Sequence, residues 1–438
     1  PALASGQTFT GRITGTVTDI QDAAVPNATV RVTEVATNVV RSARTDASGV
    51  YNVPLLAAGT YEVSVVAPGL QTQSRRDVRL QWNQVATLDF KMPVEATAYA
   101  VSVVADVPLL QSETSNVGST LETKLIESYP LMQRDVMGLL RSLPGIYSDG
   151  SVGDARATRN VFDSRFSVGG GRLNTNEVLL DGGANTIGDA NGVVIVPPQD
   201  SVQEVRVEAS TYSAEFGRSG GGVVNLMTKA GTNEFHGSLF YSHQNTVLNA
   251  NSFTNNRNGI ERPYLRRHQY GGTFGGPVWI PKLYQGKNRT FFFQSFEGRR
   301  ENDPARGLYS VPTAQELAGD FSNTFVVAGG QPALVQIFDP STTVLSAGRY
   351  VRQQFPGNKI PASRFNHVTL EALKALPKPN RPGDAITNRR NYYAEDVTTY
   401  SRDALSSRVD HYVGEKHRLF GRFSWQESLI ARPKGLVV

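Results

Sequence analysis

One catalytic pattern occurs in this sequence, a serine between glycines. Residues 217–221 read GRSGG, which fits the GxSxG form of a serine nucleophile elbow with Ser219 as the nucleophile. That elbow needs a strand before the serine and a helix after it, so that the oxyanion hole forms at the start of the helix. Here Gly222 and the run VVNLMT follow, and the two β-branched residues without a proline predict a strand instead. We therefore expect no catalytic serine and no enzyme activity.

Histidines and acidic residues are present, but their spacing matches no known metal site. Three histidines fit neither a helical nor a hairpin zinc pattern and are expected on a surface or in a lumen: His236, His243 and His268. A loose series lacks the glycine and the terminal glutamate of an EF-hand calcium loop: Asp181, Asn185 and Asp189. The GGGR at 169–172 lacks the lysine and spacing of a phosphate-binding loop. Cysteine is absent, which excludes disulfides and thiolate metal sites. No metal and no cofactor are expected.

Length and composition favour a β-rich chain of several domains. The 438 residues correspond to about two to four domains. Glycine is plentiful at 41 residues, and phenylalanine and tyrosine add 20 and 16, which with poor helical periodicity favours β structure. The net charge of +5 comes without a basic stripe or a nucleic-acid-binding motif, so no nucleic-acid partner is expected. The sequence contains no run of about 18 apolar residues, so a transmembrane helix is not predicted. Short alternating barrel strands remain compatible with the sequence.

Residues 10–92 are predicted to form one small β-sandwich. Apolar and polar residues alternate in GRITGTVTD, ATVRVTEV and GTYEVSVV, which is the period of a half-buried strand. The apolar positions in this rhythm are Ile13, Val17, Val30, Val32, Val35, Tyr61, Val63 and Val65. The turn signals VPNA, DASG and LAAGT separate the strands, and short strands at this spacing are typical of a sandwich.

The next two segments differ from the first in character. Residues 93–107, PVEATAYAVSVVADV, form a linker with a short extended apolar run. That run is either a central strand or an exposed peptide that adds to the edge of a partner's sheet. Residues 108–230 predict a small mixed α/β domain with glycine-rich loops. Its helical spacings, interrupted at Pro130 and ended by Pro144-Gly145, involve Leu121, Leu125, Val136, Leu139 and Leu140.

Residues 231–438 are expected to supply strands with one apolar and one polar face. HRLFGRFSWQ places Leu419, Phe423 and Trp425 on one face and Arg418, Arg422 and Ser424 on the other, with Phe420 as the exception. RHQYGGTFGGPVW places Tyr270, Phe274 and Val278 on one face, whereas the phenylalanines of TFFFQSFEG, 291–293, occupy both. This alternation suits a lipid-facing wall, although a soluble sandwich has the same period. The polar, proline-rich residues 301–400 suit a long loop.

Several motifs together resemble a known family. GTVTDIQDAAVPNATVRVTE and RTDASGVYNVPLLAAGTYEVSVVAPGLQT resemble the carboxypeptidase regulatory-like module, a transthyretin-like sandwich that is not catalytic. LPGI, SVGGGR, EVLLDG and VQEVRVEASTYSAEFGRSGGGVVNLMTKAGTNEFHGSLFY, in this order, resemble the plug domain of TonB-dependent outer-membrane receptors and its passage into the first barrel strand. FDPSTT, FPGNKIPASRF and LKALPKPN follow, so the chain resembles the Oar-like branch of these receptors.

The resemblance implies a mainly β fold of three parts. These are a transthyretin-like β-sandwich at 10–92, a small mixed α/β plug domain at 108–230, and the first strands of an incomplete transmembrane β-barrel at 231–438, with a long loop at about 301–400. Plugged outer-membrane transporters have barrels of about 22 strands, whereas about five or six candidate strands of the required length follow residue 231. The chain also begins at Pro1 rather than Met. We therefore expect an N-terminal fragment of a longer receptor.

The same resemblance implies a location, partners and site residues. The chain is expected in the Gram-negative outer membrane, with sandwich and plug facing the periplasm, a TonB-type energy-transducing protein as partner, and a siderophore, vitamin, glycan or peptide as ligand. The linker run stands where such receptors carry their TonB box: Tyr99, Ala100, Val101, Ser102, Val103 and Val104. The plug motifs supply structural or gating positions: Arg172, Asp181, Gly182, Gly217, Gly220, Gly221 and Gly222. These last four glycines would permit tight packing and a sharp turn where the chain leaves the plug.

Two alternatives stay open on the sequence. Basic residues near candidate strand ends form either a solvated rim or a contact for anionic lipopolysaccharide: Arg262, Arg266, Arg267, Arg299 and Arg300. The function other than transport is a cell-surface adhesion or matrix-binding protein on the same β scaffold. The plug motifs favour transport, because a binding module has no need of a gated lumen.

Overall fold

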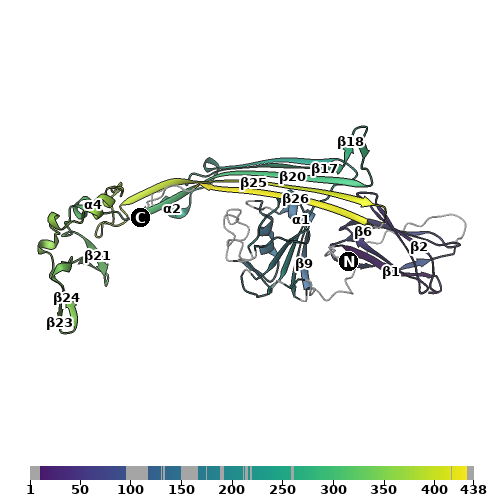
Figure 1. Cartoon of the computed structure of the whole chain (residues 1–438), viewed down its shortest axis with the longest axis horizontal. Coiled ribbons are helices and arrows are strands. Elements are labelled where there is room, and N and C mark those ends of the chain that lie inside the picture. Colours follow the sequence, from purple (N-terminus) through teal and green to yellow (C-terminus); the bar gives the residue numbers. More distant parts are fainter. Residues whose placement is uncertain are drawn as a thin grey trace, which may run out of the picture. The chain divides into compact units, whose positions relative to one another are not determined.

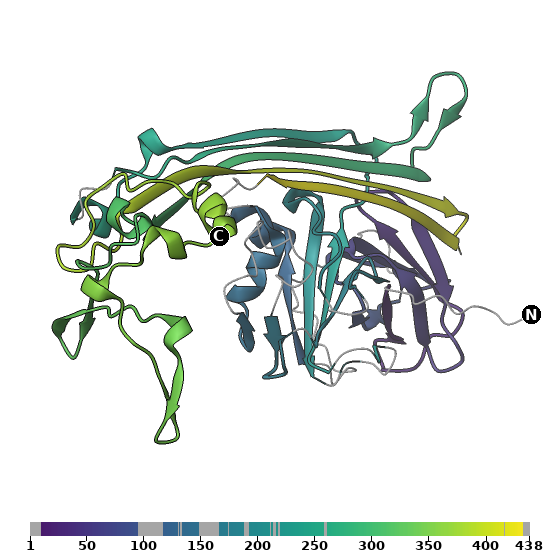
Figure 2. The same cartoon turned by 60° about the vertical axis from the view of Figure 1, so that its left-hand side comes forward.

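The chain folds into two compact units. A computed structural model describes residues 10–94, 117–129, 131, 134–148, 166–173, 175–187, 192–210, 212, 216–217, 220–257, 261–415 and 417–431. The first unit takes its residues from 10–242, 268–299 and 401–429, and the second from 243–267, 300–400 and 430–431. Figures 1 and 2 show the elements in two orientations. Among the described residues, no helix is both long and apolar enough to cross a membrane.

The N-terminal part of the first unit is a β-sandwich of two sheets. In one sheet β1 pairs with all three other strands: β1 (Gly11–Asp19), β4 (Val50–Leu56), β7 (Val85–Thr87) and β8 (Phe90–Met92). The other has the order β3-β2-β5-β6: β3 (Val40–Arg44), β2 (Thr29–Glu34), β5 (Gly59–Val66) and β6 (Gln73–Leu80). The predicted sandwich fold is confirmed.

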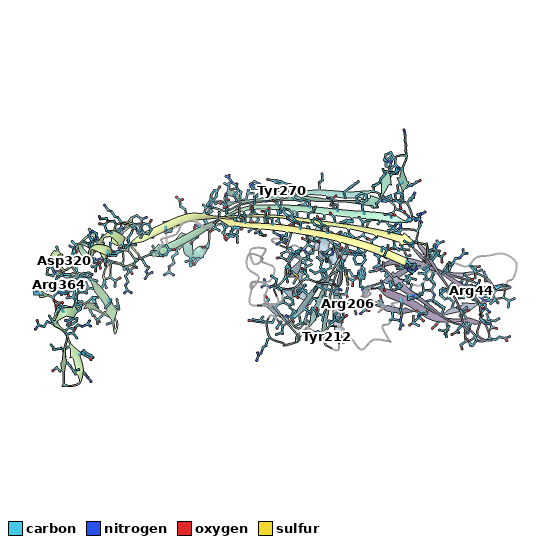
Figure 3. The ribbon with its side chains drawn as sticks, in the orientation of Figure 1. Arg44, Arg206, Tyr212, Tyr270, Asp320 and Arg364 are labelled. Carbon is cyan, nitrogen blue, oxygen red and sulfur yellow. The ribbon has the colours of Figure 1, made fainter. Side chains whose placement is uncertain are left out.

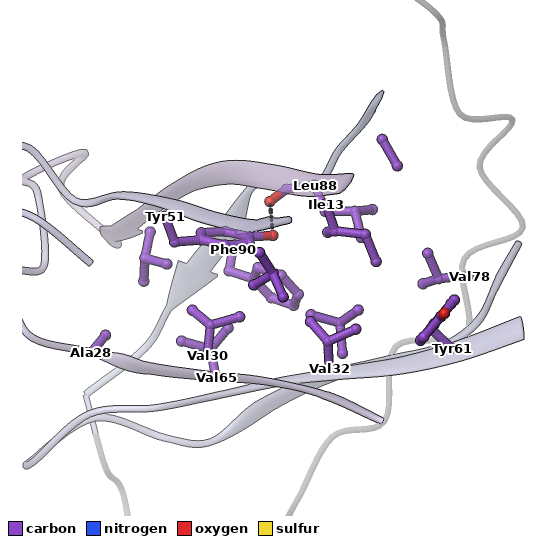
Figure 4. Packing of buried hydrophobic residues seen from close by; sticks show 14 of the residues in the cluster. Ile13, Ala28, Val30, Val32, Tyr51, Tyr61, Val65, Val78, Leu88 and Phe90 are labelled. Carbon is purple, nitrogen blue, oxygen red and sulfur yellow. Dashed lines mark hydrogen bonds between the residues drawn. The ribbon is translucent and has the colours of Figure 1, made fainter. Parts of the chain in front are cut away.

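Side chains from both sheets meet in one hydrophobic core (Figure 4). Seven of the alternating apolar positions are buried: Ile13, Val17, Val30, Val32, Tyr61, Val63 and Val65. Val35 was placed in the same rhythm wrongly, because β2 ends at Glu34 and the Val35 side chain is exposed. Tyr51 crosses the core and donates a hydrogen bond from its hydroxyl to the carbonyl of Leu88 at 2.7 Å. The Tyr61 hydroxyl donates to the carbonyl of Ala57 at 2.7 Å, so both tyrosine hydroxyls of this core are hydrogen-bonded.

The central domain of the first unit is built on a five-stranded sheet of order β13-β12-β15-β14-β9. Its strands are β9 (Val117–Glu122), β12 (Glu177–Leu180), β13 (Gly183–Ala184), β14 (Val202–Ser210) and β15 (Val223–Thr228). Beside them lie α1 (Thr123–Ser128), the 3-10 helices η1 (Val136–Ser142) and η3 (Gln199–Ser201), and the pair β10 (Ile146–Ser148) and β11 (Phe166–Val168). The predicted mixed α/β domain is confirmed.

Strand β15, the VVNLMT run, forms the middle of this sheet. It runs parallel to β12 and antiparallel to β14, and all six of its residues are buried. The helical assignment of Leu121 was wrong, since Leu121 lies on β9 and pairs with Val205 of β14. Leu125 is helical but exposed, whereas Leu139 and Leu140 of η1 are buried. Pairing across the sheet overrode the helical spacing that the sequence suggested.

Five long strands after the central domain form one antiparallel sheet, which we call the wall. Its order is β16-β17-β20-β25-β26: β16 (His236–Asn245), β17 (Arg266–Pro277), β20 (Thr290–Tyr309), β25 (Tyr392–Val413) and β26 (His417–Ala431). A small hairpin, β18 (Trp279–Ile280) and β19 (Tyr284–Gln285), lies between β17 and β20. Within the described residues, β16 and β26 are the two edges and do not pair with each other. The wall is therefore an open section of barrel, in agreement with the predicted fold class.

The two faces of the wall differ in polarity. On β26, Leu419, Phe423 and Trp425 are exposed, while Arg418 and Arg422 point to the opposite face. On β17, Phe274 is exposed and Gln269 is buried. Phe291 and Phe293 are apolar exceptions on the inner face of β20, and Phe291 is fully buried. Apolar residues outside and polar residues inside are what a lipid-facing wall requires.

The second unit contains residues 310–391, which connect β20 to β25. β20 continues to Tyr309 and β25 begins at Tyr392, so the connection is shorter than the loop expected at about 301–400. It holds α3 (Ala314–Leu317), α4 (His367–Leu373), and two hairpins, β21 (Phe325–Ala328) with β22 (Gln331–Leu334) and β23 (Val344–Ser346) with β24 (Arg349–Val351). Asn358 fixes its centre, because its side-chain amide donates to the carbonyls of Phe321 and Val335 at 2.7 and 2.8 Å.

Candidate functional site

The residues singled out in the sequence fall into three groups. The candidate energy-coupling segment, residues 99–104, lies outside the described residues. The glycines at 220–222 form the turn that leads into β15, and Gly217 is exposed just before it. Asp181 and Gly182 follow β12 directly, where Asp181 is buried. Arg172 is exposed in the loop before β12, and its carbonyl accepts a hydrogen bond from Thr175 Oγ1 at 2.8 Å.

The glycine turn packs closely against the loop before β12. The amides of Gly220 and Gly221 donate to the carbonyl of Thr175 at 2.9 and 3.2 Å. The amide of Gly222 donates to Asn176 Oδ1 at 3.1 Å. A Cβ atom at Gly222 would lie 2.5 Å from a methyl carbon of Val168 and 2.8 Å from the carbonyl oxygen of Glu208. The turn therefore requires glycine at 222 for close packing.

Asp181 binds the central domain to the wall. Its Oδ1 and Oδ2 accept hydrogen bonds from the amide and the hydroxyl of Thr228 at 2.8 and 2.7 Å, which ties the end of β12 to the end of β15. The same carboxylate pairs with Arg408 of β25 at 3.2 Å and with Arg422 of β26 at 3.1 Å. Arg408 also donates to the carbonyl of Thr228 at 3.0 Å.

The charges continue along the inner face of the wall towards the sandwich. Arg408 pairs with Asp410 at 2.8 Å, and Arg418 pairs with the same carboxylate at 2.7 Å. The side chains of Asp181, Arg408 and Asp410 are all nearly inaccessible to solvent. The next inward residue of β25, Tyr412, donates from its hydroxyl to Glu34 of the sandwich at 3.4 Å. We call Asp181, Arg408, Asp410, Arg418 and Arg422 the charge network.

Two further groups of polar contacts join the central domain to the wall. Arg134 pairs with Glu297 of β20 at 3.4 Å, and its guanidinium lies 3.8 Å from the ring centre of Phe240 on β16. Arg402 of β25 donates to the carbonyl of Val196 at 2.6 Å. By contrast, the described hydrophobic core of the central domain contains no residue of the wall. The described contacts of the central domain with the wall are therefore mainly polar, and its apolar core does not extend into the wall.

The sandwich docks on the central domain around Trp82. The Trp82 side chain is buried with Ala58 of the sandwich and Met227 of β15. The carbonyl of Trp82 accepts a hydrogen bond from Arg206 of β14 at 2.5 Å. Arg206 is labelled in Figure 3, and its Nε pairs with Glu208 at 3.0 Å. Trp82 thus contacts β15 through its side chain and β14 through its backbone carbonyl.

A cavity lies where the sandwich, the central domain and the wall meet. Its volume is about 260 Å³. Charged residues of both signs line it from all three parts, among them Glu34, Lys229, Arg408, Asp410 and Arg418. A space of this size and polarity accommodates several water molecules. The junction therefore has room for water between charged groups of all three parts.

Of the other residues considered for chemistry, His243, His268 and Asn185 have protein partners, and Asp189 lies outside the described residues. His243 Nδ1 lies 3.1 Å from the carbonyl of Arg267, and His268 Nδ1 lies 2.7 Å from the hydroxyl of Tyr241. Asn185 bonds the amide and the carbonyl of Ile195. Within the described ranges, no group of three or more His, Cys, Asp or Glu residues could hold a metal ion.

The five arginines near the strand ends do not form one basic patch: Arg262, Arg266, Arg267, Arg299 and Arg300. Arg267 and Arg299 are buried on the wall, and Arg267 pairs with Glu301 at 2.9 Å. Arg262 donates to the carbonyl of Asn249 at 3.0 Å. Arg266 is exposed at the start of β17. Successive side chains of a strand point to opposite faces of the wall, so arginines that are close in sequence lie on different faces.

Several residues of the site carried no signal of their own in the sequence. Asp181 was identified through the EVLLDG motif, and alternation assigned Arg418 and Arg422 to a polar face. Arg408 and Asp410 alternate with Val409 in the same manner, and that pattern could have placed both on the inner face of β25. Trp82 stands alone between polar residues, and no local pattern indicates its docking contact.

We expect alanine to be tolerated at Gly220 and not at Gly222. The Cβ at 222 would overlap Val168 and a strand carbonyl, whereas the nearest atom to a Cβ at 220 is 3.7 Å away. Overpacking of this kind costs about 1–3 kcal/mol. Thermal unfolding of the complete protein in detergent should show a lower melting temperature for Gly222→Ala and little change for Gly220→Ala. Equal melting temperatures would contradict the close packing of the turn.

The carboxyl group of Glu204 should make stability pH-dependent. Burial raises its pKa to about 7, against the opposing effects of Arg206 and a hydrogen bond from the Trp82 backbone, while Glu122 raises it slightly further. A raised pKa means that the folded state holds the proton more tightly than the unfolded state. Stability from this group is therefore complete below about pH 4.5 and is lost as the pH rises through about 7.

Glu204→Gln should remove that pH dependence. At pH 8 we expect the variant to unfold at a higher temperature than the parent, by an amount equivalent to at most about 3 kcal/mol. At pH 4.5 the two proteins should unfold alike, because Glu204 is then protonated. The measurement is a thermal unfolding series of both proteins between these pH values, and parallel curves would refute the assignment.

Comparison with known proteins adds the family. Residues 12–93 match the carboxypeptidase regulatory-like domain family, and residues 227–437 match the outer membrane β-barrel domain family. The TonB-dependent transporter Oar of Myxococcus xanthus is 27% identical over 287 residues, which are 62% of this chain and 26% of Oar. The chain thus spans about a quarter of the length of that relative.

Two solved receptors are also similar. The siderophore receptor PirA of Acinetobacter baumannii is 15% identical with a TM-score of 0.35, over 72% of this chain and 32% of its own. The ferric enterobactin receptor PfeA of Pseudomonas aeruginosa is 13% identical with a TM-score of 0.36, over 73% of this chain and 34% of its own. These TM-scores are too low to support an argument about ligand. The family and domain matches confirm the resemblance drawn from the motifs: the chain is a homologue of the TonB-dependent transporter Oar, with a carboxypeptidase regulatory-like domain and an outer membrane β-barrel domain, and it is located in the outer membrane.

Proposed function

We propose that this chain serves in TonB-dependent uptake of a ligand across the outer membrane, with residues 108–230 as the plug. The observation that carries the proposal is the pairing of Asp181, in the central domain, with Arg408 and Arg422 of the wall. A domain held inside a wall by buried charges has one defined position. It can also leave that position without exposing an apolar surface, since its core does not extend into the wall.

The order of the strands suggests how a pull on the linker would act. The linker precedes β9, which is an edge strand and pairs only with β14 in the described sheet. The β9–β14 pair begins with Val117 opposite Ser210 and ends with Glu122 opposite Glu204. Tension at Val117 would therefore open the hydrogen bonds one pair after another from that end. Sequential opening requires less force than breaking all pairs together, because each step loses only one pair of bonds.

The docked sandwich would respond to the same pull. It precedes the linker in sequence and contacts β14 and β15 through Trp82. The last pair of β9 and β14 to open would be the one at Glu204, which lies next to Trp82. We infer that release of the sandwich from β14 is the last barrier before the plug can rearrange.

Homology to a transporter favours a role that is not enzymatic. The strand β15 after the GRSGG turn agrees with that role, because a nucleophile elbow continues into a helix. The adhesion alternative has no support from the family matches. Contact with lipopolysaccharide is retained as a proposal for Arg262, Arg266 and Arg300, since Arg267 and Arg299 are buried.

The energy-coupling segment gives the direct test of this function. Val101, Val103 and Val104 favour an extended backbone that can add to the sheet edge of a TonB-type protein. Proline at 103 removes a backbone donor and restricts φ, whereas alanine preserves both. In the complete receptor, Val103→Pro should weaken binding of the purified periplasmic domain of TonB by about tenfold or more, and Val103→Ala should have a small effect.

Both variants need to retain the fold for this comparison. Unchanged melting temperatures of both variants in detergent would establish that. Binding of the TonB domain to the proline variant with parental affinity would place the coupling segment elsewhere. Absence of binding to the parent receptor as well would contradict the TonB-dependent function itself.

A further inference from the structure

The β18–β19 hairpin extends from one end of the wall. In Figures 1 and 2 it leaves the sheet on the side away from the central domain. Trp279 pairs with Gln285 and Ile280 with Tyr284, and the turn closes with a hydrogen bond from the amide of Leu283 to the carbonyl of Ile280 at 3.0 Å. The hairpin is therefore a defined element.

Side-chain contacts fix this hairpin to the wall. The Tyr284 hydroxyl lies 2.5 Å from Thr290 Oγ1, which in turn lies 2.7 Å from His411 Nδ1 on β25. At the base, the amide of Val278 donates to the carbonyl of Thr290 at 2.8 Å, and the amide of Gly286 donates to that of Val278 at 2.7 Å. The direction of the hairpin is thus set by the wall strands.

The tip of the hairpin exposes large apolar side chains. Leu283, Trp279 and Ile280 are 81%, 63% and 46% exposed. Such residues close together on a rigid projection indicate a surface that binds an apolar partner.

Basic residues surround this apolar tip. Lys282, Lys287 and Arg289 are exposed, and residues 279–289 contain no acidic residue. Lys282 has φ +62° at the third position of the turn, where glycine or asparagine would be less strained.

The apolar tip continues the outer face of the wall. Phe235 and Phe274 stack with ring centres 5.8 Å apart, and Phe292 lies 5.4 Å from Phe274. Phe235 and Phe274 each remain about half exposed on this face. Since the outer face of the wall contacts lipid, the surface next to the hairpin is the hydrocarbon region of the membrane.

Backbone contacts fix which end of the wall carries the hairpin. Asn233, three residues before β16, donates from its amide to the carbonyl of Ala36 in the sandwich at 3.0 Å. The Asn233 side-chain oxygen accepts from the amide of Asn288, in the turn between β19 and β20, at 2.7 Å. The hairpin and the sandwich are therefore at the same end of the wall.

We propose that the β18–β19 hairpin inserts into the phospholipid leaflet on the sandwich side of the membrane. Trp279, Ile280 and Leu283 lie among acyl chains near the interface, where tryptophan is preferred. Lys282, Lys287 and Arg289 contact the phosphate groups, as long basic side chains at an interface do. The hairpin thus anchors the sandwich end of the wall at a fixed depth.

The test measures the surroundings of residue 283 in the complete receptor. The chain has no cysteine, so Leu283→Cys can carry a single environment-sensitive fluorophore, after replacement by serine of any cysteine in the rest of the receptor. Leu345→Cys in the β23–β24 hairpin is the matched control, because Leu345 is also apolar and 66% exposed at a hairpin tip. The receptor is reconstituted in phosphatidylethanolamine–phosphatidylglycerol vesicles that contain lipids with a nitroxide quencher on the acyl chain.

The proposal predicts a blue-shifted emission at position 283 that the nitroxide lipids quench and aqueous iodide does not. Position 345 should respond in the opposite sense. Iodide quenching at 283 would overturn the proposal, because the tip would then be in water. Protection from both quenchers would overturn it as well, since another protein surface would then cover the tip. Ile280→Cys, on the other side of the turn, repeats the measurement if the label at 283 disturbs folding.

Discussion

The position of the central domain against the wall depends on one buried carboxylate, that of Asp181. This carboxylate joins the ends of two strands of the central domain, through Thr228, to two strands of the wall, through Arg408 and Arg422. Buried ion pairs contribute little net stability, because desolvation offsets most of their attraction, but the loss of one partner is costly. Such a contact therefore favours one position of the domain over its neighbours, but it adds little to the free energy needed to remove the domain. That combination is what a domain needs if it must be both located and moved.

The remaining contacts divide according to what each partner has to do. Contacts between the plug and the wall are polar, as at Arg134–Glu297 and Arg402–Val196. The contact between the sandwich and the plug includes apolar burial of Trp82 against Met227. Burial of apolar surface stabilises a contact without requiring a particular orientation. Charged contacts, by contrast, restrict the relative orientation of the two partners. The glycine turn at 220–222 leads into β15, and the other end of that strand, at Met227 and Thr228, takes part in both interfaces.

Alternation of residue types predicted much of this architecture, and it failed where contacts between distant segments decide the structure. The core positions of the sandwich, such as Val30 and Val63, follow from local rhythm because one face of each strand is buried. Leu121 reads as helical in its own neighbourhood, but pairing with Val205 places it in a strand. Asp181 came from a motif, yet its partner Arg408 is 227 residues away. No local pattern specifies such a pair, since only the closed fold brings it together.

The force needed to draw the plug from the wall tests the central claim most directly. A single receptor in a supported bilayer would be pulled by a handle attached in the linker, residues 93–107, and the force of plug release recorded. Asp181→Asn keeps the shape of the side chain and removes the charge that faces Arg408 and Arg422. Asp200→Asn is the control, because Asp200 pairs at 2.6 Å with Arg134 within the plug itself. The account predicts a lower release force for Asp181→Asn and a nearly parental force for Asp200→Asn. Equal release forces in the parent and Asp181→Asn would contradict it.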